Sequence, residues 1–305
     1  MNKLPIIAGS LLFSSLLAFS ATKENLPTPT HGDISYGKDP KQKIDIWLAK
    51  SDAPTPLVVY IHGGGWTGGD KDAISKDYLT PLLDRGISVA SINYRLSKTN
   101  PLPVPVHDAA RALQFVRSKA SEWNLDKERV ALMGNSAGGC TSLWIAFHDD
   151  LANEKSEDPV ERESTRVCAV FSRNGQTSID PKWITEHIGV KGAEHSMICS
   201  AVGEASLTAV LKNYETHEVL YTEFSPLTHL TPDDPPYYGL YAGHNEVPAI
   251  SLGAGIHHRV FGIKLKEKSD AIGHSGCLST KRNRTSLSEI DFITKILLGK
   301  NSDEK

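Results

Sequence analysis

The 305-residue sequence predicts an α/β fold, in which a mostly parallel, twisted β-sheet carries helices on both faces and an inserted cap. Short apolar runs alternate with amphipathic helical segments, which is the pattern of strand–helix–strand units in a parallel sheet. Two glycine-rich stretches, 62–66 and 134–138, each follow an apolar run. The alternation loosens at 177–230 and then resumes, as expected if a cap is inserted at the carboxyl edge of the sheet.

The first twenty residues differ from the rest of the chain. Lys3 supplies a positive charge, Leu4 to Phe19 is apolar, and Ala18-Phe19-Ser20 resembles a signal-peptidase site. We expect residues 1–20 to be a signal peptide, so that the exported protein (periplasmic or secreted) keeps no stable membrane span. An uncleaved anchor is the alternative, but the run is slightly shorter than the about 20 residues that span a bilayer.

We expect residues 21–40 to form a lead-in linker and residues 41–300 one α/β domain with a cap at 177–230. An antiparallel edge hairpin is predicted from alternating residues at Ile34–Tyr36 and Ile44–Leu48. The other predicted strands are Leu57–Ile61, Ile87–Tyr94, Val130–Met133, Val167–Phe171, Tyr237–Tyr241 and Cys277–Ser279. The predicted helices are Lys76–Arg85, Val106–Trp123, Gly139–Phe147, His257–Ile272 and Leu287–Leu298, with helix-like pieces in the cap around 183–188 and after Leu207.

Charge and cysteine content exclude several classes of function. A formal net charge of −3 gives no basic surface for a nucleic acid. The four cysteines, Cys140, Cys168, Cys199 and Cys277, are too few and too scattered for a zinc site or a disulfide framework. We expect Cys140 and Cys168 to be buried thiols. Export would permit a disulfide, but the sequence identifies none.

Residues 134–138, Gly-Asn-Ser-Ala-Gly, fit the G-x-S-x-G nucleophile elbow, in which a serine sits on a sharp turn between a strand and a helix. Glycines at both ends are needed because the backbone of the serine is strained and its close neighbours must lack side chains. The sequence therefore predicts Ser136 as a nucleophile. A glycine-rich turn that only packs a helix on a strand is the alternative, which leaves the second glycine-rich stretch unexplained.

Residues 62–66, His-Gly-Gly-Gly-Trp, fit a loop whose backbone amides stabilise an oxyanion. We expect the donors to be the amides of Gly64, Gly65 and Ala137. His62 should order this loop through its side chain and not act as a base. Trp66 either lines the acyl or alcohol pocket or packs in the core.

A serine nucleophile needs a histidine base and, in most enzymes, an acid that orients it. Glu246 is the carboxylate in the loop after the predicted strand 237–241, and His274 follows it by 28 residues. We expect Glu246 as the acid and His274 as the base. A solvated loop glutamate and a structural histidine are the alternatives. His257 and His258 are interpreted as structural or pocket-edge residues at the start of a helix.

These motifs resemble those of α/β-hydrolases of the esterase/lipase branch related to hormone-sensitive lipase. The chain is most similar to exported bacterial acetylxylan/feruloyl esterase-like (BD-FAE-like) proteins. The resemblance covers roughly 42–298 and rests on the motifs at 62–66 and 134–139, and on the stretches 93–95, 107–113 and 234–236.

The resemblance implies hydrolysis of small acyl or aryl esters, or of esters linked to polysaccharide, through an acyl-enzyme, without a metal or organic cofactor. The branch carries its histidine after the last strand, where this chain has Lys281-Arg282-Asn283-Arg284-Thr285. It also has an aspartate where this chain offers Glu246. A non-catalytic binding protein of the same fold, with a degenerate triad, is the alternative function.

Overall fold

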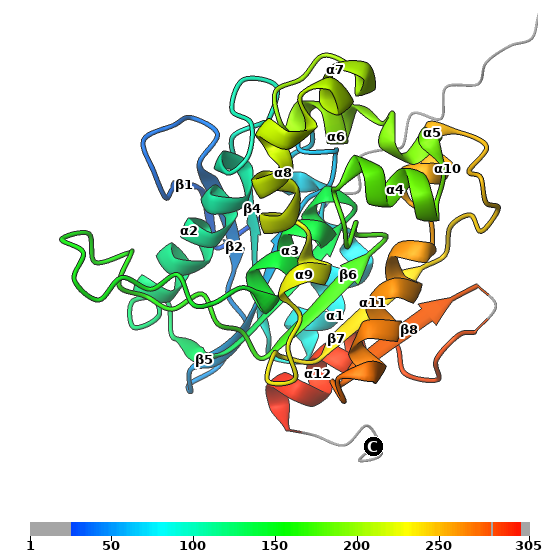
Figure 1. Cartoon of the computed structure of the whole chain (residues 1–305). Coiled ribbons are helices and arrows are strands. Elements are labelled where there is room, and N and C mark those ends of the chain that lie inside the picture. The colour runs from blue at the N-terminus through cyan, green and yellow to red at the C-terminus, as the bar shows by residue number, and fades with distance from the viewer. Residues whose placement is uncertain (1–25, 282, 300–305) are drawn as a thin grey trace, which may run out of the picture.

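A computed structural model describes residues 26–281 and 283–299. Eight strands form one sheet in the order β1-β2-β4-β3-β5-β6-β7-β8 (Figure 1). The pairs β1–β2 and β2–β4 are antiparallel, and all the others are parallel. The strands are β1 (His31–Ser35), β2 (Lys43–Trp47), β3 (Thr55–Ile61), β4 (Ser88–Ile92), β5 (Leu125–Asn135), β6 (Ala169–Arg173), β7 (Tyr237–Tyr241) and β8 (Gly276–Thr280).

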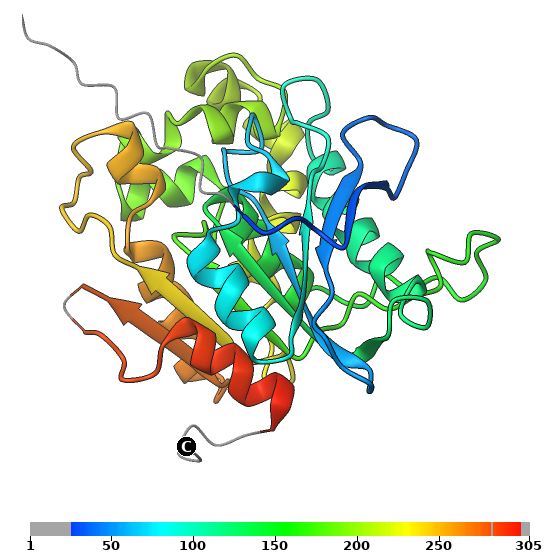
Figure 2. The same ribbon diagram turned by 180° about the vertical axis from the view of Figure 1, so that it is seen from behind.

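Helices cover both faces of the sheet and bury two apolar clusters. On one face, α1 (Lys76–Asp84) and α12 (Glu289–Leu298) pack on the central strands (Figure 2). On the other, α2 (Val104–Ser118), α3 (Ala137–Phe147) and α11 (Val260–Ala271) enclose the larger cluster. β3 is buried along its whole length, as expected for a central strand with helices on both sides.

The cap consists of short helices between β6 and β7. They are α4 (Pro181–His187), α5 (Val190–Ala193), α6 (Ser196–Ala201), α7 (Leu207–Lys212), α8 (Tyr214–Glu223) and α9 (Pro226–His229). α5 packs closely on α10 (Leu252–Ile256), and the two lie side by side in Figure 1. α6 packs on the glycine-rich loop, because the Cβ of Met197 lies 3.3 Å from where a Cβ on Gly65 would stand.

The predicted fold class is confirmed, and each predicted strand and helix of the core has a counterpart. Two differences concern boundaries. β1 begins three residues before the edge strand predicted at Ile34–Tyr36 and pairs with β2, so residues 31–35 of the expected lead-in linker belong to the sheet. The helix expected at 257–272 begins at Val260, and the separate helix α10 precedes it. The expected signal peptide lies outside the described residues. No helix in the described part of the chain is long and apolar enough to cross a bilayer.

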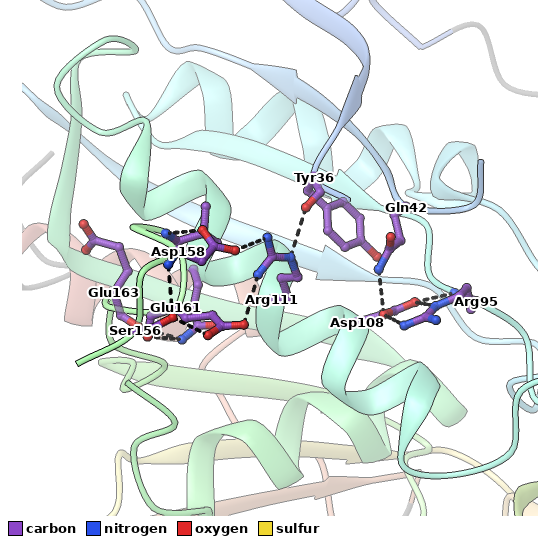
Figure 3. A network of polar contacts seen from close by, with 11 residues as sticks. Tyr36, Gln42, Arg95, Asp108, Arg111, Ser156, Asp158, Glu161 and Glu163 are labelled. Carbon is purple, nitrogen blue, oxygen red and sulfur yellow. Dashed lines mark hydrogen bonds and ion pairs between the residues drawn. The ribbon is translucent and has the colours of Figure 1, made fainter. Parts of the chain in front are cut away.

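A polar network anchors the loop after β4 to α2 (Figure 3). Buried Asp108 accepts from Nε and Nη2 of Arg95, at 2.8 and 2.6 Å, and from the Gln42 side chain at 2.8 Å. One turn later, Arg111 donates to the Tyr36 carbonyl oxygen and pairs with Asp158. The stretches at 93–95 and 107–113 that carry part of the family resemblance therefore hold the fold together.

Candidate active site

Ser136 lies on the turn between β5 and α3, at the carboxyl edge of the parallel sheet. Its backbone has φ 53° and ψ −123°, a left-handed conformation that costs on the order of 1–3 kcal/mol for a residue with a side chain. The Ser136 amide donates to the Arg173 carbonyl oxygen at 2.8 Å, which ties the turn to β6. The serine therefore has the geometry predicted for a nucleophile elbow.

This turn requires glycine at positions 134 and 138, because the surrounding backbone leaves no room for a Cβ there. A Cβ on Gly138 would overlap the carbonyl oxygen of Ile61, and one on Gly134 would overlap the Gly138 carbonyl group. The end of β3 can thus approach the start of α3, which brings the loop at 62–66 close to Ser136. A Cβ on Gly63 would lie 3.3 Å from the Cβ of Ser136.

His62 fixes the shape of this loop. Its Nδ1 lies 2.7 Å from the Gly63 carbonyl oxygen, so Nδ1 donates and carries the proton. The ring stacks on Tyr94 with the centroids 4.3 Å apart, and the Tyr94 hydroxyl donates to the His62 carbonyl oxygen at 2.9 Å. Burial lowers the pKa of His62 and keeps the ring neutral. These contacts agree with the expectation that His62 orders the loop.

Trp66 belongs to the core. Its side chain is 1% exposed, and the indole N–H donates to the Thr141 hydroxyl at 2.9 Å. Thr141 lies on the second turn of α3, so this bond joins the glycine-rich loop to the helix that starts beside Ser136. Of the two roles considered for Trp66, packing is the one that the structure shows.

Three backbone amides around Ser136 have no acceptor. Within the described residues, the N–H groups of Gly64, Gly65 and Ala137 donate no hydrogen bond to the protein. Ala137 is the first residue of α3, where amides lack a partner inside the helix and the helix dipole favours negative charge. These amides are suited to hold an oxygen that gains negative charge.

The imidazole next to Ser136 is that of His257. Its Nε2 lies 2.8 Å from the Ser136 Oγ. His257 is the C-cap residue of α10, in the connection that follows β7 at the carboxyl edge of the sheet. Burial is the main cause that lowers its pKa below 6.5, and repulsion from His244 lowers it further. The neutral ring can therefore accept the proton of the serine hydroxyl.

The neighbour of this imidazole on α10 is the backbone of Gly253. The Gly253 backbone, one turn earlier in α10, interacts with the imidazole of His257 and acts to raise its pKa. No aspartate or glutamate in the described part of the chain pairs with His257. The arrangement is a serine–histidine dyad supported by the end of a short helix.

The expectation that His274 is the base does not agree with its position. Its Nδ1 lies 3.3 Å from the Ser269 hydroxyl, and its Nε2 lies 3.1 Å from the Asp234 carbonyl oxygen. The ring packs against Phe147, the last residue of α3, whereas Ser136 precedes the first. An 11-residue helix is roughly 16 Å long. His274 precedes β8 and therefore lies at the amino edge of the sheet, opposite the serine.

Glu246 does not reach the dyad as an acid either. It follows β7 as expected, but its side chain is exposed. Its backbone carbonyl interacts with the imidazole of His258. The direction of a side chain in an irregular loop cannot be inferred from residue order. Among the described residues, no cluster of histidine, cysteine, aspartate or glutamate is arranged to hold a metal ion.

A comparison with protein families identifies the family of this chain and shows which of the site residues the match contains. The BD-FAE family matches residues 44–246, more than half of the chain. The chain belongs to the BD-FAE family. The part that matches BD-FAE contains Ser136 and the loop at 62–66, whereas His257 lies beyond it.

Two curated proteins that are similar to this chain are named as hydrolases of esters. The chain is 28% identical over 229 residues to the "Probable carboxylic ester hydrolase LipM" of Mycobacterium tuberculosis. The matched region covers 73% of this chain and 50% of LipM. It is 30% identical over 176 residues to the "Probable isoprenylcysteine alpha-carbonyl methylesterase ICMEL1" of Arabidopsis thaliana, covering 57% of this chain and 36% of that protein. The chain thus spans half or less of these two curated relatives.

A solved structure confirms the α/β-hydrolase fold of this BD-FAE member. The acetyl ester-xyloside bifunctional hydrolase from Caldicellulosiruptor lactoaceticus superposes with a TM-score of 0.61, at 20% sequence identity and over 84% of both chains. At this identity the likeness concerns the fold.

Proposed function

We propose that this protein is an exported serine carboxylesterase that hydrolyses small acyl esters through an acyl-enzyme. The observation that carries the proposal is the 2.8 Å contact between the Ser136 Oγ and the His257 Nε2. A serine hydroxyl is a weak nucleophile until a neutral imidazole can take its proton, and burial keeps His257 neutral by lowering its pKa.

In the first half of the proposed reaction, the Ser136 Oγ attacks the ester carbonyl carbon while its proton moves to the His257 Nε2. The carbonyl oxygen becomes an oxyanion, and the amides of Gly64, Gly65 and Ala137 donate to it. The bond between the carbonyl carbon and the alcohol oxygen then breaks. The departing oxygen takes the proton from the His257 Nε2, which leaves an acyl group on Ser136 and a neutral imidazole.

In the second half, a water molecule repeats the same steps. His257 takes a proton from the water as the water oxygen attacks the acyl carbon. When the new intermediate collapses, the proton returns to the Ser136 Oγ and the carboxylic acid leaves. The Gly253 carbonyl, whose interaction with the imidazole acts to raise the pKa of His257, is proposed to keep the ring in the same tautomer throughout. Because this carbonyl is neutral, it stabilises the imidazolium less than a carboxylate would.

We further propose that the substrate carries a short acyl group, such as acetyl, on a carbohydrate. Support comes from two solved structures with the same fold, those of an acetyl ester-xyloside bifunctional hydrolase and of a carbohydrate esterase from gut microbiota. Export rests on the N-terminal sequence, which lies outside the described residues.

The test is turnover and active-site labelling of the purified protein. We expect hydrolysis of p-nitrophenyl acetate and labelling of Ser136 by a fluorophosphonate, located by mass spectrometry. Ser136→Ala should lose the label and lower kcat by at least about a thousandfold. A correctly folded wild-type protein that binds esters without turnover, and whose Ser136 stays unlabelled, would instead be a binding protein of this fold.

A further inference from the structure

A second imidazole, that of His195, lies in the cap beside the glycine-rich loop. His195 precedes α6, and its Nδ1 accepts a hydrogen bond from the Met197 amide at 3.1 Å. Since Nδ1 is the acceptor, the proton of the neutral ring is on Nε2. The side chain is half-buried. In the part of the chain that the structure describes, Nε2 of His195 has no hydrogen-bond partner.

The position of this ring is defined by the glycine-rich loop and by the base. The Cε1 of His195, the atom between its two nitrogens, lies 3.8 Å from where a Cβ on Gly65 would stand. His257 is close enough for its charge to act on His195. The ring therefore lies on the cap side of the site, near both the amides proposed to hold the oxyanion and the imidazole proposed to move the proton.

The charge of His195 restricts what it can bind. Burial is the main cause that lowers its pKa, and repulsion from His257 adds to the effect. The ring is therefore neutral near pH 7, and it offers an N–H to a neutral oxygen and not a positive charge to an anion. Hydroxyl, ether and ring oxygens are acceptors of this kind.

The proposed mechanism indicates which part of a substrate would meet this donor. His257 returns its proton to the departing alcohol, so the alcohol must lie beside the His257 Nε2. We propose that His195 forms a subsite for the alcohol part of the ester, with its Nε2–H donating to a second oxygen of that alcohol. Such a donor favours alcohols that bear oxygens next to the ester, as sugars do, over phenyl or simple alkyl alcohols.

The inference rests on the proposed esterase function, and its readout is a ratio of two reactions. The first substrate is a mono-O-acetylated methyl xyloside, and the second is phenyl acetate, whose alcohol has no second oxygen. His195→Asn retains a side chain that caps a helix but removes the Nε2–H. His195→Gln has a longer side chain than His195→Asn, so its amide N–H comes nearer to the position of the imidazole Nε2. Glu194→Gln, a change at the exposed neighbour, is the matched control.

We expect His195→Asn to lower the ratio of kcat/KM for the acetylated xyloside to that for phenyl acetate by about 5- to 100-fold, since losing a partner of a buried polar group costs about 1–3 kcal/mol. His195→Gln should recover part of the ratio, and Glu194→Gln should keep it. An unchanged ratio in His195→Asn, or an equal loss on both esters, would overturn the subsite while the esterase function stands. A wild-type protein inert on both esters would overturn the esterase function and the subsite together.

Discussion

The His257 Nε2 lies 2.8 Å from the Ser136 Oγ, although 121 residues separate the two in the sequence. The contact forms because each residue follows a parallel strand, β5 or β7, and both strands end at the carboxyl edge of the sheet. The segment after β8, where the family resemblance placed the base, contributes Lys281 and Arg284 to a cavity of about 390 Å³ that Arg173 also lines. Positive charges there would disfavour a base that must become an imidazolium.

The first prediction separates the two candidate bases. His257→Gln should lower kcat for p-nitrophenyl acetate by about 10³- to 10⁶-fold, as removal of a catalytic base does. His274→Gln should keep kcat and reduce the free energy of unfolding by about 1–3 kcal/mol, since it removes a buried ring that stacks on Tyr237. Steady-state kinetics and urea unfolding of both variants check this. Loss of turnover in His274→Gln without unfolding would return the role of base to His274.

The second prediction concerns pH. Only neutral His257 can accept the serine proton, and its pKa is lowered from 6.5 by burial, with a smaller effect of His244. kcat/KM should therefore be constant at neutral and higher pH and fall as the pH drops through a midpoint below 6.5. Replacing exposed His244 by asparagine removes the repulsion and should move this midpoint upward. A wild-type midpoint above 6.5 would contradict the dyad, because it would require a carboxylate beside His257.

The strands and helices of the core could be predicted from the sequence because apolar residues recur along them in a regular pattern. His257 as the base could not be predicted in this way. α10 contains Gly253, Ala254 and Gly255, and such small residues give no period by which a helix is recognised. The sequence therefore predicts His257 as the start of the following helix. One signal was available: His257 follows a parallel strand, as Ser136 does, whereas His274 precedes one.

The sharp turn at Ser136 and the close packing of the glycines could be predicted from sequence because backbone geometry dictates these residue types. The positive φ of Ser136 and the close approach of Gly138 to β3 require these residue types at these positions. The acid was harder to predict. The sequence predicts Glu246 because it is the carboxylate of its loop, but its side chain is exposed, and no sequence pattern gives the direction of a side chain in such a loop.

The third prediction tests the oxyanion loop with a matched pair of glycines. Gly64 has φ 105°, and a Cβ on it would overlap the carbonyl oxygen of Gly68. Gly64→Ala should displace the amide and lower kcat by about 10²- to 10³-fold with a smaller effect on KM. A Cβ on Gly68 meets nothing within 4 Å, so Gly68→Ala is the control and should keep kcat. Equal kcat in the two variants would mean that the Gly64 amide does not hold the oxyanion.

The last prediction tests whether the cap positions the base. A Cβ on Gly255 would lie 2.5 Å from the Gly192 nitrogen of α5, so Gly255→Ala must push α10 away from the cap. His257 ends α10, and its ring would move with the helix. Because a misplacement of about 1 Å can cost about 100-fold in rate, we expect a loss of that order in kcat.

Gly253→Ala is the control for this prediction, because a Cβ on Gly253 meets nothing within 4 Å and the backbone that interacts with His257 is kept. The two variants add the same methyl group to the same short helix, so their kcat values differ only through the contact with α5. Circular dichroism should find both variants folded. If kcat stays at the wild-type value in a folded Gly255→Ala protein, α10 holds His257 in place without help from the cap.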